Sequence, residues 1–166
     1  MDSTRIPGIT LLAVVSALAL SSCTPAPGGA NTSATDETAI RAANTAEADA
    51  GGRAFALDRG DDDSWEVHVA VGDREVEVHL ASDGATVQSR SDDDGIDADE
   101  RAALDAAVTT LADAVRIAAA QNPGGDRIDE VELDDDGGDW SWTVEMQSGA
   151  VVRIAAGDGA VVSTGR

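Results

Sequence analysis

Two histidines and two glutamates are the residues of this chain whose types and spacing could do chemistry most directly. Glu66 and His68 precede a Gly72-Asp73 turn signal, and Glu77 and His79 follow it. A two-residue turn there places His68 opposite Glu77 and Glu66 opposite His79 on one face of a hairpin. Two imidazoles and two carboxylates on one face could bind a transition metal. Opposite-charge pairing across the strands, worth a few tenths of a kcal/mol, is the simpler interpretation, so we predict no metal site and keep these four residues as the alternative.

Three acidic runs, Asp61–Asp63, Asp92–Asp94 and Asp134–Asp136, suggest calcium loops. An EF-hand loop needs a glutamate at its twelfth position. The two runs that are followed by glycine place Arg101 and Thr143 there, so both fail the pattern. We expect solvated turns, and weak association of divalent cations with the runs stays open as an alternative.

Catalysis has little support in the residue inventory. Cys23 is the only cysteine, and neither histidine lies near a serine in an arrangement typical of nucleophilic catalysis. The 32 acidic residues offer no distinctive pair. We therefore predict no catalytic residue, no cofactor and no enzyme. The net charge of −21, with arginine as the only strongly basic residue type, also excludes nucleic acid as a partner.

Cys23 has a different chemistry. Arg5 and the apolar stretch 9–20 precede Leu20-Ser21-Ser22-Cys23, and that stretch is shorter than the roughly 20 residues of a membrane span. The motif resembles the lipobox of bacterial lipoproteins. The resemblance implies a signal peptide over residues 1–22, lipidation of Cys23, and a place on the extracytoplasmic face of the cell membrane. Residues 23–35, rich in small and polar types, are expected to form a flexible tether.

After the tether the sequence repeats one order of expected elements: a helix, a strand, an acidic turn, a hairpin, and a last short strand. The first unit is expected over residues 36–91, an acidic linker over 92–96, and the second unit over 97–166. The expected helices and strands of the first unit cover 37–48, 54–58, 65–71, 75–80 and 85–89. Those of the second unit cover 97–118, 128–133, 140–146, the segment around 152–154, and 160–164.

The second unit has the better helix signal. Asp97 and Glu100 form a D-x-x-E capping box, and apolar residues then recur every three or four positions, at Leu104, Val108, Leu111, Val115 and Ala118. This spacing predicts one continuous amphipathic helix.

Alternation along the strands predicts which side chains face the core. Val67, Val69, Val76 and Val78 should point inward, which leaves His68 and His79 exposed. In the second unit we expect burial of Leu111, Val115, Trp142, Val144 and Ile154. Trp140 shares a face with Trp142, so core packing is the first interpretation of this pair and a ligand-stacking platform is the second.

Short motifs repeat at matching places in the two units. The helices carry Ala39-Ile40-Arg41-Ala42-Ala43 and Ala114-Val115-Arg116-Ile117-Ala118, and the central strands carry Trp65-Glu66-Val67 and Trp142-Thr143-Val144. The last turns read Asp83-Gly84-Ala85-Thr86-Val87 and Asp158-Gly159-Ala160-Val161-Val162. Together these motifs resemble the PepSY domain, in two tandem copies.

The resemblance implies an α+β fold of two tandem lobes, each a helix packed on an antiparallel sheet. It also implies a role in binding or restraining peptidases or other envelope partners, and no shared catalytic residues. We therefore predict a membrane-anchored module that binds a protein or peptide. The alternative is a lipoprotein that binds a small ligand or a divalent cation through the acidic turns or the His/Glu face.

Overall fold

A computed structural model describes residues 33–93, 95–122 and 124–166. The expected signal peptide, Cys23 and most of the expected tether lie outside these residues. The first half contains α1 (Ala34–Ala50), β1 (Arg53–Arg59), β2 (Trp65–Val71), β3 (Arg74–Leu80) and β4 (Val87–Asp93). The second contains α2 (Ala98–Ala106), α3 (Leu111–Gln121), β5 (Ile128–Asp135), β6 (Trp140–Met146), β7 (Val151–Ala155) and β8 (Val161–Gly165). No helix among the described residues is long and apolar enough to cross a membrane.

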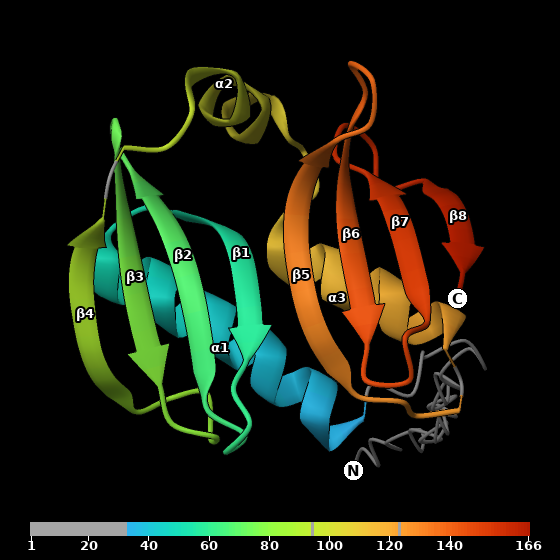
Figure 1. Ribbon diagram of the computed structural model, residues 1–166, viewed down its shortest axis with the longest axis horizontal. Coiled ribbons are helices and arrows are strands. Elements are labelled where there is room, and N and C mark those ends of the chain that lie inside the picture. Colours follow the sequence, from blue (N-terminus) through green and yellow to red (C-terminus); the bar gives the residue numbers. More distant parts are fainter. Residues whose placement is uncertain (1–32, 94, 123) are drawn as a thin grey trace, which may run out of the picture.

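The eight strands form one antiparallel sheet in the order β4-β3-β2-β1-β5-β6-β7-β8. Helices α1 and α3 lie side by side on one face of it (Figure 1). The predicted α+β class, with helices packed on an antiparallel sheet, is confirmed. What the sequence did not predict is that the two units share this sheet. Strand β1 pairs with β5, through Leu57 with Val131 and Asp58 with Glu130, and this pairing is the seam between the units.

Helix α1 packs closely on the sheet because its inner side consists of small residues. Ala39, Ala42, Ala43 and Ala46 are at most 1% exposed. Ser33 caps the helix: its side chain accepts a hydrogen bond from the backbone N–H of Asp36, while the Asp36 carboxylate accepts one from the Ser33 N–H. This reciprocal pair is a capping box and fixes where the helix starts.

The predicted continuous helix of the second unit is wrong, because the chain breaks it between α2 and α3. Val108, expected on the buried side, is 75% exposed. The backbone N–H groups of Val108 and Thr109 donate to the carbonyl of Ala156 instead of continuing the helix. Thr110 then starts α3, its hydroxyl accepting a hydrogen bond from the backbone N–H of Asp113. The Thr110-x-x-Asp113 signal and three successive β-branched residues favour this break.

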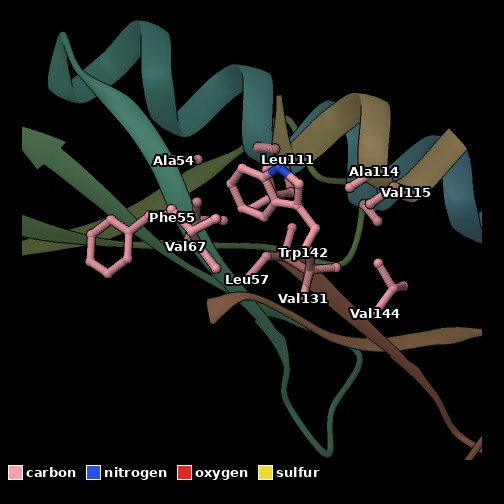
Figure 2. Close-up of a cluster of buried hydrophobic side chains, with 14 of the residues drawn as sticks. Ala54, Phe55, Leu57, Val67, Leu111, Ala114, Val115, Val131, Trp142 and Val144 are labelled. Atoms are coloured by element: carbon pink, nitrogen blue, oxygen red, sulfur yellow. The ribbon is translucent and has the colours of Figure 1, made fainter. Parts of the chain in front are cut away.

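The core lies between the sheet and its two helices. All five residues predicted to be buried in the second unit, namely Leu111, Val115, Trp142, Val144 and Ile154, are at most 1% exposed. Figure 2 shows Trp142 pointing from β6 toward Leu111 on α3. Its indole Nε1 donates a 3.0 Å hydrogen bond to the carbonyl of Thr109, so the break before α3 also provides the partner that a buried indole needs.

Two glycines hold equivalent turns against the two helices. Gly84 and Gly159 both have positive φ, 64° and 74°. A Cβ on Gly84 would lie 2.4 Å from the carbonyl oxygen of Thr38 on α1, and one on Gly159 would lie 3.3 Å from Ile117 on α3. Left-handed backbone and close approach therefore both favour glycine, which explains the repeated Asp-Gly motif.

Strand β4 is longer than the sequence predicted. It runs to Asp93, and its residues Asp92 and Asp93 pair with Val76 and Glu75 of β3. Two aspartates that were expected in the acidic linker therefore belong to the sheet.

Candidate functional site

The face of the sheet opposite α1 and α3, called here the open face, carries a row of acidic side chains. Strand register places Glu145, Glu130, Asp58 and Glu66 side by side on four adjacent strands, from β6 to β2. His79 on β3 continues the row, opposite Glu66. We call the four acidic residues the carboxylate row, and it crosses the seam between the two units.

A second row runs parallel to the first. Glu132, Ala56, His68 and Glu77 lie in register on β5, β1, β2 and β3. Arg153 on β7, next in register beyond Thr143, is the one arginine in the two rows. Negative charge therefore dominates the centre of the open face.

The pKa values of several acids on the open face are raised. Partial burial, together with the charges of Glu66 and Asp129, raises the pKa of Asp58 although His68 acts in the opposite direction. Burial and neighbouring acids, Asp58 first among them, raise the pKa of Glu130. Burial and the charges of Asp134 and Asp58 raise the pKa of Glu132, although His68 acts in the opposite direction. These carboxylates therefore disfavour their charged forms in the folded protein.

Helix α2 adds a further acid to this environment. Burial and the charges of Glu75 and Glu132 raise the pKa of Glu100 on α2. The guanidinium of Arg53 fixes α2 by donating to the carbonyls of Leu104 and Ala107.

The two histidines and their acids form a linked cluster, with Glu66 between the rings. Glu66 Oε1 lies 3.3 Å from His68 Nε2, and Glu66 Oε2 lies 3.5 Å from His79 Nδ1. His79 Nε2 also contacts Glu77. The predicted register of the hairpin is confirmed, with His68 opposite Glu77 and Glu66 opposite His79.

Glu75 is the member that the sequence analysis did not single out. His68 Nδ1 hydrogen-bonds to Glu75, which lies diagonally across the strands, rather than to Glu77 directly opposite. Burial alone would lower the pKa of His68, but the hydrogen bond to Glu75 and the charges of Glu75, Glu66 and Asp58 outweigh it, so the pKa of His68 is raised. The alternation of β3 placed Glu75 on this face, but only the side-chain geometry shows which acid His68 contacts.

The expectation that both histidines are exposed is wrong. The side chain of His68 is 21% exposed and that of His79 is 37% exposed. A bulge in β1 between Ala54 and Ala56 brings the ring of Phe55 to 6.0 Å from that of His68. The Phe55 ring and the contacting acids Glu75, Glu66 and Asp58 surround His68, which explains why its ring is only partly solvated.

Three of the four residues kept as the alternative metal site come together. One possible ligand atom from each of Glu66, Glu77 and His79 lies within 4.8 Å of the other two. Within residues 33–93, 95–122 and 124–166 this is the group with metal-ligand spacing, and His68 is outside it.

The acidic runs have arginine partners in the structure. Each run contributes at least one aspartate to an ion pair: Asp63 with Arg59 and Arg127, Asp92 with Arg74, and Asp136 with Arg153. The chain's own arginine side chains therefore already contact the acidic runs that suggested calcium loops.

The two tryptophans of β6 lie in different environments. Trp142 is fully buried in the core, whereas Trp140 is partly exposed and lines an apolar groove with Ala103, Ala156 and Val162. Core packing therefore accounts for Trp142, and the groove leaves only Trp140 available to stack on a ligand.

Comparison with known proteins assigns part of the second unit to a protein family. Residues 110–164 match the family model described as the peptidase propeptide and YPEB domain, PepSY. The matched segment begins at the residue that caps α3 and ends in β8, so α3 and strands β5 to β8 form a PepSY domain, and α2 lies outside it. Helix α1 and strands β1 to β4 of the first unit follow the same order of one helix and four strands as the matched segment, and they lie outside it.

The crystal structure of a putative lipoprotein from Clostridium difficile 630 is similar to this chain. The identity is 14%, the TM-score is 0.44, and the alignment covers 74% of this chain and 88% of the other. No curated protein matches the chain.

Proposed function

We propose that the chain is a membrane-anchored, extracytoplasmic interaction module that binds a basic, extended segment of an envelope protein on its open face. The lipobox motif at Cys23 supports the anchor and the compartment. The PepSY domain supports a binding role rather than a catalytic one, and its description as a peptidase propeptide makes a peptidase the first partner class to consider.

The carboxylate row is the observation that carries this proposal. Four acidic side chains stand next to one another on adjacent strands, and acids directly opposite each other destabilise a sheet. Burial and neighbouring acids raise the pKa values of Asp58 and Glu130, so the charged forms of both side chains are less favourable in the folded chain than in water. A row that works against folding is explained by a partner that supplies the missing positive charge.

The shape and charge of the site define the partner's chemistry. Strands pair about 4.8 Å apart, so the four acids span roughly 14 Å, a length that about five residues of an extended peptide crossing the strands would cover. Lysine and arginine side chains complement such a row, and the charge of −21 would speed the encounter with a basic partner.

Photocrosslinking in intact cells tests the proposal. A photoreactive amino acid is introduced at Ser91, an exposed neutral position of β4 in register with Glu77, or at Asn44, an exposed position on α1 behind the sheet. We expect Ser91 to crosslink one envelope protein through a segment rich in lysine or arginine, identified by mass spectrometry. Equal crosslinking from Asn44, or crosslinked segments without basic residues, would contradict the proposal.

A further inference from the structure

The geometry points to a second binding function of the open face: Glu66, Glu77 and His79 form a site for a divalent transition metal, zinc being the ion that best suits these ligands. This site does not depend on the basic partner proposed above. It uses Glu66, at the β2 end of the carboxylate row, and two residues of β3, and it does not include the seam acids Asp58 and Glu130.

The spacing of the three side chains is close to that of a bound ion. Zinc binds histidine nitrogen and carboxylate oxygen at about 2.0–2.2 Å, so two ligands of one ion lie no more than about 4.4 Å apart. The candidate ligand atoms of Glu66, Glu77 and His79 already lie within 4.8 Å of one another. Small rotations of side chains that are only partly buried would close the remaining difference.

The backbone holds the ligands in register. Glu66 and His79 are directly opposite each other on β2 and β3, and Glu77 precedes His79 by two residues on the same side of β3. Both strands are interior to the sheet, because β1 and β4 pair with their outer sides. A site on two interior strands is more rigid than one on a loop, which favours a defined metal geometry.

The ligand types select among metals. Calcium and magnesium take oxygen ligands, whereas imidazole suits zinc and other transition metals. One imidazole and two carboxylates leave a fourth position for water or for a side chain of a partner. Both ring nitrogens of His79 face a carboxylate, Glu77 at Nε2 and Glu66 at Nδ1.

The negative charge of the residues around the site also favours binding of a cation. Glu66 is next to Asp58 in the carboxylate row, and Glu75 is a further acid on β3. A dication at His79 would offset repulsion among these acids, so zinc binding should also raise the thermal stability of the chain.

Calorimetric titration of the full chain with zinc chloride tests the site directly. All samples carry Cys23→Ala, which removes the one thiol that could bind zinc, and are kept in detergent. Two matched pairs separate a defined site from general negative charge. Glu77→Gln and Glu132→Gln each remove one acid from the same face, and His79→Gln and His68→Gln each remove one imidazole from the same hairpin.

We expect one zinc per chain, with calcium binding far more weakly. His79→Gln and Glu77→Gln should weaken zinc binding by about tenfold or more, the usual effect of disturbing a metal site, while His68→Gln and Glu132→Gln change it little. Circular dichroism checks that each variant is folded. If a histidine variant unfolds, the comparison of Glu77→Gln with Glu132→Gln still tests the site.

Equal losses within each pair, calcium binding as tight as zinc, or no zinc binding at all would each overturn the site. Those results would leave the crosslinking at Ser91 unaffected, so failure of the metal site and failure of the partner proposal are distinguishable.

Discussion

Asp58 on β1 lies directly opposite Glu130 on β5, so two acids face each other at the seam that joins the two units. Leu57 and Val131, the neighbouring pair, are fully buried on the other face. Burying a side chain of that size contributes roughly 1.5–3 kcal/mol, whereas a like-charge pair across strands costs at most about 1 kcal/mol. Apolar burial therefore holds the seam together against the repulsion.

Removing one charge at the seam should stabilise the protein. We expect Glu130→Gln to raise the free energy of unfolding by about 0.5 kcal/mol at pH 7, because it relieves the repulsion from Asp58. Chemical denaturation measures the change. Asp61→Asn, in the exposed turn between β1 and β2, removes the same charge away from the row and should have no such effect. A destabilised Glu130→Gln variant would show that this acid supports the fold.

The same acids should make stability depend on pH in a defined direction. Because the pKa values of Asp58, Glu130 and Glu132 are raised, the folded state holds protons that the unfolded state releases. Their contribution is fully present below the unfolded values near pH 4 and is lost as pH rises through the raised values. Denaturation between about pH 4 and pH 7 should show Glu130→Gln flattening this decline relative to wild type. If the stability of Glu130→Gln declines with pH as steeply as that of wild type, the prediction is wrong.

The break between α2 and α3 gives a matched pair of core variants. Leu111 is 1% exposed and Val108 is 75% exposed, although helical spacing places both on one side. Leu111→Ala should cost about 2–5 kcal/mol, and Val108→Ala should change stability by about 0.5 kcal/mol or less. Thermal melts of the two variants measure these changes in stability. Similar losses in both would mean that the two residues belong to one buried helix face.

His68 should support folding most at acidic pH. Its pKa is raised by Glu75, Glu66 and Asp58 against the effect of burial. The contribution is therefore present below the unfolded value near pH 6.5 and is lost as pH rises through the raised folded value. A double-mutant cycle of His68→Gln and Glu75→Gln, measured by denaturation, should give a larger coupling energy at pH 6 than at pH 8.5. Equal coupling at both pH values would show that the contact does not depend on the charged imidazole.

The anchor is tested at Cys23, which lies outside the described residues. We expect the wild-type chain to fractionate with membranes, and Cys23→Ala to remain unprocessed or to be released. Cell fractionation with immunoblotting measures this, and Ser22→Ala, which keeps a small residue in the lipobox, is the control. The same soluble behaviour of wild type and Cys23→Ala would contradict lipidation.

Local signals in the sequence predicted the individual elements well. The Gly72-Asp73 turn and strict alternation were enough to predict the register of β2 and β3, because a shift by one residue would bury Glu66 and His79. The break before α3 was missed, although Thr110-x-x-Asp113 is a capping signal, because the apolar spacing continues across it.

The candidate site was less predictable than the elements. Asp58 and Glu130 lie far apart in the sequence and meet only because β1 pairs with β5, and no local pattern specifies which strand edges of two units join. The bulge that brings Phe55 to His68 also has no distinctive sequence signal. The hairpin cluster could therefore be predicted, whereas the carboxylate row could not.

The most direct measurement of the central claim is the crosslinking yield at Ser91 in cells that carry Asp58→Asn and Glu130→Gln together. The seam acids are proposed to bind a basic partner rather than to support the fold. The double variant should therefore be at least as stable as wild type and lose most of its crosslinking, about tenfold or more, because two charges that contact the partner are removed, while Asp61→Asn keeps the wild-type yield. An unchanged yield in a folded double variant would contradict the account.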